Sequence, residues 1–125
     1  MKRNLVLFIM ALSLASGAIA QNAGDRKAIS PEKFSRQMKK NHVMVIDVRT
    51  TEEFRAGHIP GALHIDIKQQ DFTQRIRSLD PSKKYLLYCR TSKRSGAALD
   101  SMHSYGFSKV FHLRGGIENW KGKVE

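Results

Sequence analysis

Three short apolar runs constrain the fold of this chain most strongly. They occupy residues 43–46 (VMVI), 85–88 (YLLY) and 110–113 (VFHL). Runs of this length, rich in β-branched and aromatic residues, are typical of strands that are buried on both faces. Helical segments separate the runs, so we predict an α/β fold in which a largely parallel sheet carries helices on both faces.

Helix-start signals punctuate the chain between these strands. Thr50 and Glu53 have the spacing of a capping box, and Gly57 should end the short helix that they open. Ser95 is expected to cap a helix that runs to about Tyr105. The remaining expected elements are a helix that starts at Pro31 after Ser30 and ends near Asn41, a strand over residues 63–65, a helix over residues 72–79 and a short last helix that contains Trp120.

The first twenty residues have the layout of a secretory signal peptide. A basic start at residues 1–3 precedes an apolar stretch over residues 5–15, and Ala18 and Ala20 supply the small residues of a cleavage site. The apolar stretch is too short to span a bilayer, which argues against a membrane anchor. We therefore expect a cleaved leader over residues 1–20, a flexible arm over 21–27, a single domain over 28–125 and a periplasmic location.

The chain is strongly basic, with a formal net charge of +11. Such a charge attracts small anions, anionic lipid or nucleic acid. Most of the basic residues are scattered, as on an ordinary cationic surface, but Arg90, Lys93 and Arg94 gather beside the cysteine. Export and the lack of an aromatic and basic recognition motif argue against a nucleic-acid partner.

Cys89 is the only cysteine, so an intramolecular disulfide is impossible. An unpaired cysteine in an exported protein is either a reactive thiol or a buried, inert side chain. Cys89 follows a central strand and precedes a helix, at the sheet edge where ligands bind in parallel α/β folds. This position favours the reactive alternative.

The segment after Cys89 suits a thiolate. Backbone N–H groups between a strand and a helix N-terminus can turn toward the sulfur, and the nearby basic residues favour the anionic form. Such a thiolate can attack the outer sulfur of an anion such as thiosulfate, retain it as a persulfide and release sulfite. The sulfur then passes to an external acceptor, namely cyanide, a small thiol or a partner protein. No metal or organic cofactor is required.

Four segments together resemble the rhodanese family. They are residues 46–49 (IDVR), residues 53–62 (EFRAGHIPGA), the cysteine loop over residues 88–95 and the closing segment over residues 106–120. The leader and the single domain look most like small periplasmic members. The resemblance implies a sheet of about five parallel strands, Cys89 as the persulfide carrier of a thiosulfate sulfurtransferase, and a cradle of backbone amides from Arg90, Thr91, Ser92, Lys93, Arg94 and Ser95.

One loop residue departs from the family pattern. Ser92 occupies a place where the family often has glycine, which tolerates a positive φ at little cost. Serine loses about 1 kcal/mol or more in that conformation. Either the loop differs in shape, or the serine hydroxyl adds a hydrogen bond.

Several nearby side chains have two plausible roles. Arg94 either binds the substrate anion or braces the loop through a salt bridge, and Arg90 and Lys93 either steer anions or are plain surface charges. Asp47 is expected to be structural, bonding loop amides, and Arg49 could reach the active site. The histidines have no metal-ligand spacing, and His58 is expected to brace its turn rather than act as a base.

Two other functions use the same residues. Cysteine phosphatases and arsenate reductases place five residues between cysteine and arginine, whereas four separate Cys89 from Arg94. A loop that is one residue shorter fits a sulfur atom better than a phosphoryl group. Alternatively, the domain is a rhodanese-like binding or redox module, although such modules commonly lack the cysteine that this chain keeps.

Overall fold

The computed structural model describes residues 26–125. The expected leader and residues 21–25 of the expected arm lie outside this part. Lys27, at the end of the arm, already touches the sheet, because its carbonyl accepts the backbone N–H of His112 at 3.0 Å. None of the helices in the described part is long and apolar enough to span a bilayer.

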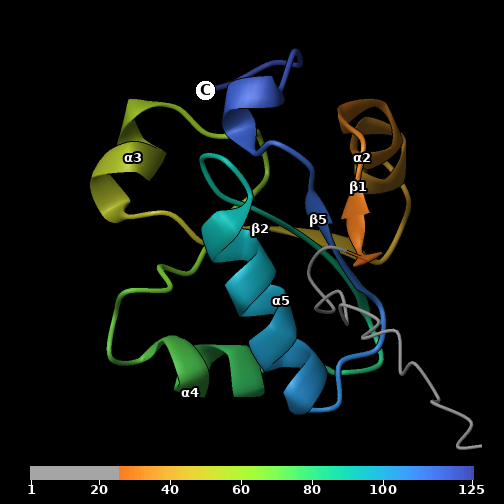
Figure 1. The fold of residues 1–125 in the computed structure, drawn as a ribbon, viewed down its shortest axis with the longest axis vertical. Coiled ribbons are helices and arrows are strands. Elements are labelled where there is room, and N and C mark those ends of the chain that lie inside the picture. Colours follow the sequence, from red (N-terminus) through yellow and green to blue (C-terminus); the bar gives the residue numbers. More distant parts are fainter. Residues whose placement is uncertain (1–25) are drawn as a thin grey trace, which may run out of the picture.

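The core of the molecule is a five-stranded sheet in the order β1-β5-β4-β2-β3, and every pair of neighbouring strands is parallel. Figure 1 shows β1 and β5 side by side. The strands are β1 (Ala28–Ile29), β2 (Val43–Asp47), β3 (Leu63–His64), β4 (Lys84–Tyr88) and β5 (Val110–Leu113). This arrangement confirms the predicted fold. It also places β4, the strand that leads into Cys89, in the middle of the sheet.

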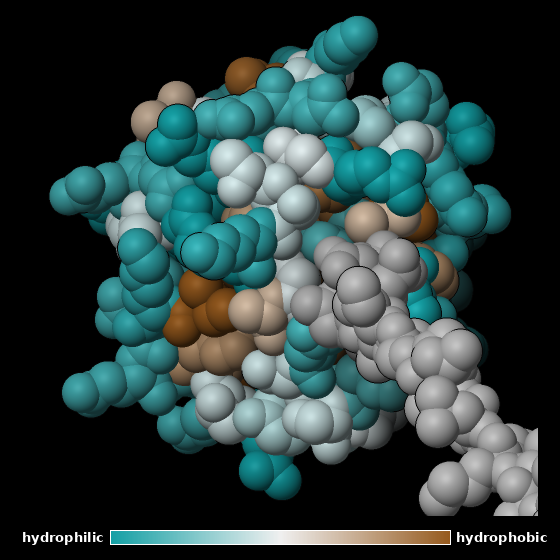
Figure 2. All heavy atoms as spheres, in the orientation of Figure 1, coloured by the Kyte–Doolittle hydropathy of each residue, from teal (hydrophilic) through white to brown (hydrophobic). Residues whose placement is uncertain are grey.

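Helices cover both faces of this sheet, and two apolar clusters lie beneath them. The helical elements are α2 (Pro31–Met38), α3 (Thr51–Ala56), α4 (Phe72–Arg77), α5 (Lys93–Ser104) and the 3-10 turn η1 (Ile117–Asn119). Phe72 of α4 and Leu99 of α5 pack in one cluster, whereas Phe34 of α2 packs in the other. Figure 2 shows a largely hydrophilic surface on the viewed face, apart from a small apolar area beside α5.

Several local predictions differ from the structure, among them the helix predicted over residues 72–79, which ends at Arg77. α5 begins at Lys93, not after Ser95, because Ser92 takes a left-handed conformation with a φ of 105° and turns the chain into the helix three residues earlier. α2 ends at Met38, before Asn41. Trp120 follows η1 as its C-cap instead of lying within it, and its ring packs edge-on against Phe34 with the ring centroids 5.7 Å apart.

Candidate active site

Cys89 lies at the carboxyl end of β4, with only 1% of the residue exposed. Its carbonyl accepts the N–H of Ile117 at 2.9 Å, and the carbonyl of Arg90 accepts the N–H of Glu118 at 3.2 Å. Gly116 lies so close to this backbone that a Cβ there would stand 2.2 Å from the Arg90 carbonyl oxygen. The turn at η1 therefore holds the start of the cysteine loop from outside.

Two loop residues hydrogen-bond the sulfur. The backbone N–H of Ser92 donates to Sγ at 3.2 Å, and the Ser95 hydroxyl lies 3.5 Å from Sγ. Ser95 is fully buried in the first turn of α5. Positive φ at Ser92 points its N–H at the sulfur, although its side chain makes no capping hydrogen bond. The sulfur therefore has a polar contact on the side of the helix N-terminus, where negative charge is favoured.

Arg94 is engaged in an ion pair with Glu53. Its two terminal nitrogens lie 2.6 and 2.9 Å from the two carboxylate oxygens. The hydrogen bonds from Arg94 lower the pKa of Glu53 to about 2 despite its partial burial, and they also raise the pKa of Arg94. This contact matches the bracing alternative for Arg94. The sequence predicted Glu53 as a capping residue but gave no sign of this long-range partner.

The other basic loop residues face solvent. Arg90 forms an ion pair with Glu118 at 2.7 Å, with 65% and 51% of the two side chains exposed. Thr91 and Lys93 are exposed as well. Arg90 and Lys93 are therefore both exposed residues of the cysteine loop, and Arg90 is already paired with a carboxylate.

Asp47 and Arg49 form a buried pair on the neighbouring strand end. Asp47 accepts the backbone N–H of Arg49 at 2.9 Å and its Nη2 at 2.7 Å, and Arg49 also donates to the carbonyl of Gly57 at 2.7 Å. The amide that Asp47 binds therefore belongs to the loop after β2, not to the cysteine loop. Arg49 also lines a hollow of about 430 Å³ together with Arg90, the residue that follows Cys89, and Glu118.

The ring of Tyr88 lies beneath this pair, with the Arg49 guanidinium 5.5 Å from its centroid. Its hydroxyl accepts the N–H of Ile59 at 3.0 Å. Burial and the nearby Asp47 carboxylate raise the pKa of Tyr88, so the phenol stays protonated.

The predicted turn histidine, His58, braces its own loop through a 3.0 Å contact between Nδ1 and the carbonyl of Phe54.

One contact of the site was not predicted from the sequence. His112 on β5 is 3% exposed, and its Nδ1 lies 2.8 Å from the Ser95 hydroxyl. The only signal in the sequence that could have indicated this contact is a single polar residue near the end of an otherwise apolar strand.

Residues 26–125 contain no cluster of histidine, cysteine or carboxylate side chains suited to a metal ion.

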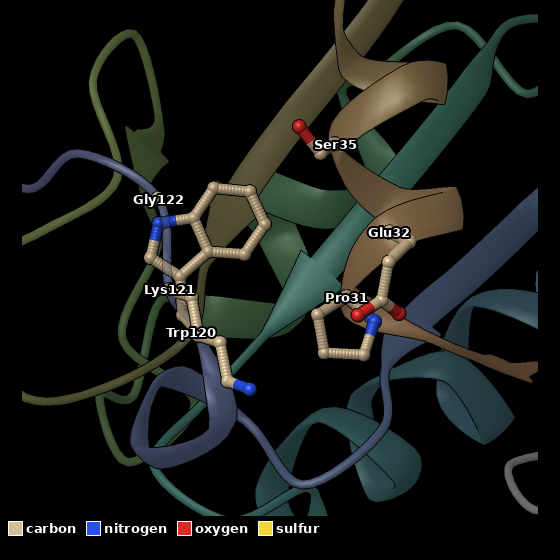
Figure 3. A pocket seen from close by; sticks show the side chains of 6 residues that line it. All are labelled: Pro31, Glu32, Ser35, Trp120, Lys121 and Gly122. Carbon is tan, nitrogen blue, oxygen red and sulfur yellow. The ribbon is translucent and has the colours of Figure 1, made fainter.

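A second hollow, of about 400 Å³, lies against α2. Figure 3 shows Trp120 facing the first turn of α2 across it. Its lining residues are Pro31, Glu32, Ser35, Trp120, Lys121 and Gly122, and none of them belongs to the cysteine loop. Of the two hollows, only the first includes a residue of the cysteine loop, which is Arg90.

Sequence comparison places the chain among known domains. A family model for the rhodanese-like domain matches residues 30–123. The chain is 35% identical to the thiosulfate sulfurtransferase GlpE of Pseudomonas putida over 95 residues, which cover 76% of this chain and 84% of that protein. It is 31% identical to the putative sulfur carrier protein YrkF of Bacillus subtilis, covering 85% of this chain but only 57% of that longer protein.

Solved structures share the fold. A rhodanese-related protein from Thermoplasma volcanium superposes with a TM-score of 0.70 at 25% identity, covering 79% of this chain and 97% of that one. Protein hp1203 from Helicobacter pylori gives a TM-score of 0.63 at 30% identity, covering 82% and 91% of the two chains.

Proposed function

Because this chain belongs to the rhodanese-like domain family, we propose that it is a sulfurtransferase that carries a sulfane sulfur on Cys89. The observation that carries the proposal is the environment of Sγ. The sulfur lies at the carboxyl end of the middle strand, receives the N–H of Ser92 at 3.2 Å and lies at the N-terminus of α5. A helix N-terminus favours a thiolate, which is the nucleophile that sulfur transfer needs.

The reaction divides into two displacements. The Cys89 thiolate attacks the outer sulfur of thiosulfate, an S–S bond forms at Sγ, and the S–S bond of the donor breaks with its electron pair leaving on sulfite. A nucleophilic acceptor then attacks the outer sulfur of the persulfide and returns the Cys89 thiolate. Cyanide would leave as thiocyanate, whereas a thiol would become a persulfide. Ping-pong kinetics follows from the covalent intermediate.

The surroundings of the sulfur favour a small anionic donor. Only 1% of Cys89 is exposed, so a small donor reaches it more readily than a bulky one. Arg90 and Lys93 are exposed in the cysteine loop, and their positive charges attract anions, which supports thiosulfate as the donor. Arg49 lines a hollow together with Arg90. The chemistry requires no metal or cofactor. Cyanide, a small thiol or a thiol protein serves as the acceptor.

The relatives and the ion pairs bear on the alternatives. A role as a sulfur carrier for a partner protein uses the same persulfide and is supported by the name of YrkF. The phosphatase and arsenate reductase alternative needs the loop arginine to bind the oxyanion. Here both terminal nitrogens of Arg94 are bound to Glu53 instead, which argues against it.

We also propose that the protein works in the periplasm, with residues 1–20 removed on export. The proposal rests on the basic start, the apolar stretch and the small residues at positions 18 and 20. Cell fractionation combined with N-terminal sequencing tests it. A mature protein that starts at Gln21 in the periplasmic fraction is expected, and an uncleaved protein in the cytoplasm would contradict it.

Sulfur loading followed by intact mass tests the function directly. The mature protein is incubated with thiosulfate, its mass is measured, and cyanide is then added while thiocyanate is assayed. We expect a species heavier by one sulfur atom, its loss on adding cyanide, and neither event in Cys89→Ser. If no sulfur is loaded from thiosulfate, but a small persulfide loads Cys89, the carrier role replaces thiosulfate transfer. If neither donor loads Cys89, the sulfurtransferase proposal is wrong.

A further inference from the structure

A line of three buried side chains leads from the sulfur into the sheet. The hydroxyl of Ser95 lies 3.5 Å from Sγ of Cys89 on one side and 2.8 Å from Nδ1 of His112 on the other. The exposed fractions of the three residues are 1%, 0% and 3%, so water is largely excluded from this line. The loop, the first turn of α5 and strand β5 contribute one residue each.

A hydroxyl has one proton, and Ser95 has three neighbours that could accept it. They are the carbonyl of Ser92 at 3.1 Å, Nδ1 of His112 at 2.8 Å and the sulfur at 3.5 Å. The sulfur donates to the Ser95 oxygen while it is a thiol and can accept the serine proton only as a thiolate. The outcome depends on which nitrogen of His112 carries hydrogen. If Nδ1 lacks a proton, it takes the serine proton through the shortest of these contacts, and the lone pairs of the hydroxyl then face the sulfur. That arrangement suits a thiol and opposes a thiolate.

The opposite arrangement favours the nucleophile. When Nδ1 carries a proton, it donates to the Ser95 oxygen. The hydroxyl hydrogen of Ser95 then no longer points at His112 and can turn toward another acceptor. A thiolate attracts that proton because a hydrogen bond to a charged acceptor is stronger than one to a neutral carbonyl. The Ser95 hydroxyl then adds a second donor to the N–H that Ser92 already directs at Sγ.

We propose that His112 is a positioning residue that donates from Nδ1 to the Ser95 hydroxyl and so turns the serine proton toward the sulfur of Cys89. The histidine touches neither the sulfur nor a substrate in this role. Its place is fixed by β5, since its backbone N–H bonds Lys27 and its ring lies against Gly96 of α5. The proposal deepens the proposed function, because it rests on Cys89 as the nucleophile, but it does not depend on the identity of the donor.

Alkylation of Cys89 by iodoacetamide tests the proposal without any turnover. Because the chain has one cysteine, the rate of mass increase reports on this residue alone. His112→Leu keeps an apolar side chain in the strand and removes the hydrogen bond, so we expect alkylation at neutral pH to slow by roughly 5- to 10-fold, the range for one lost hydrogen bond. His112→Asn places an amide near the former Nδ1 and should recover most of the rate.

A double-mutant cycle separates this role from a general loss of packing. Ser95→Ala should slow alkylation by a similar factor, and Ser95→Ala with His112→Leu should be no slower than Ser95→Ala alone. Multiplying effects in the double variant, or an unchanged rate in His112→Leu, would overturn the proposal. If His112→Leu does not fold, the test rests on His112→Asn. An Asn variant that folds but is alkylated as slowly as Ser95→Ala also overturns the proposal.

Sulfur loading from thiosulfate, measured on the same proteins, keeps the two proposals apart. If the wild type is alkylated with the expected coupling but loads no sulfur from thiosulfate or a small persulfide, the proposed function fails and the role of His112 stands. If the wild type loads sulfur but His112→Leu is alkylated as fast as the wild type, the proposed function stands and the role of His112 fails.

Discussion

Glu53 holds Arg94 through both oxygens of its carboxylate, at 2.6 and 2.9 Å, and thereby joins α3 to the first turn of α5. The same carboxylate accepts the hydroxyl of Thr50 at 3.1 Å and completes the capping box of α3. The Glu53 side chain thus caps its own helix and also forms a long-range ion pair. The cysteine loop is therefore braced by a side chain of α3 that lies forty-one positions before Arg94 in the sequence.

Replacing Glu53 by Gln should lower stability in a pH-dependent way. The pKa of Glu53 is lowered from 4.5 to about 2 in the folded protein, so its stabilisation is complete above pH 4.5 and is lost as the pH falls through about 2. We expect Glu53→Gln to cost about 1 to 2 kcal/mol at neutral pH, after allowing for partial exposure, with the gap to wild type closing in acid. Urea unfolding across this range measures it. Glu52→Gln, an exposed neighbour, is the control, and a constant gap would contradict the prediction.

Replacing Ser92 by Gly should stabilise the fold. Ser92 has a φ of 105°, where a side chain is strained, and it makes no capping hydrogen bond in return. Glycine removes that strain but adds freedom to the unfolded chain, so the expected net gain is about 0.5 to 1 kcal/mol, or several degrees in Tm. Calorimetry measures the shift. Ser92→Ala keeps the strain and should melt close to the wild type; equal melting of all three would refute this account.

Breaking the buried pair of Asp47 and Arg49 should be costly. The two side chains are 0% and 6% exposed and their closest atoms are 2.7 Å apart. Arg49→Met leaves a buried carboxylate without its partner, for which we expect a loss of about 3 to 5 kcal/mol by urea unfolding. Adding Asp47→Asn removes the stranded charge and should restore part of that loss. A double variant that is less stable than Arg49→Met would contradict this explanation.

A methyl group on Gly116 should displace the cysteine loop. The new Cβ would lie 2.2 Å from the Arg90 carbonyl oxygen, and Gly116 has a φ of 64°. We expect Gly116→Ala to cost about 3 kcal/mol or more and to reduce sulfur loading. Gly61→Ala is the matched control, because its φ is 81° but nothing lies within 4 Å of the added carbon. Its cost should be only about 1 to 2 kcal/mol, with loading unchanged. Similar behaviour of the two variants would show that the contact with Arg90 is unimportant.

Local patterns predicted much of this fold. The runs at residues 43–46 and 85–88 form β2 and β4, as predicted. The burial expected on both faces holds for β4 better than for β2, where Met44 is 37% exposed. The capping box at Thr50 and Glu53 formed as expected. The strand β1 was not predicted, because two residues carry too little pattern and its pairing with β5 is a long-range contact.

The site was predictable only as far as it is local. Cys89 and its loop were identified from one segment, but the partners that act on them come from elsewhere in the chain. The capping box already accounted for Glu53 in the sequence, so nothing there indicated its pairing with Arg94. The N-terminus of α5 was misplaced because Ser95 looks like a cap, whereas the left-handed turn at Ser92 had already started the helix. His112 lies in an apolar run, and its contact with Ser95 could not be predicted because it forms only where α5 packs against β5.

The hydrogen bonds from Ile117 and Glu118 to the carbonyls of Cys89 and Arg90 also bear on timing. They hold the backbone of Cys89 and Arg90 against the closing turn through the protein's own groups, independently of any donor. A site assembled in advance needs no lid closure or loop reordering as a slow step in each cycle. The cycle should then be limited by encounter with the donor or by bond exchange at sulfur, and solvent viscosity would slow it only in the first case.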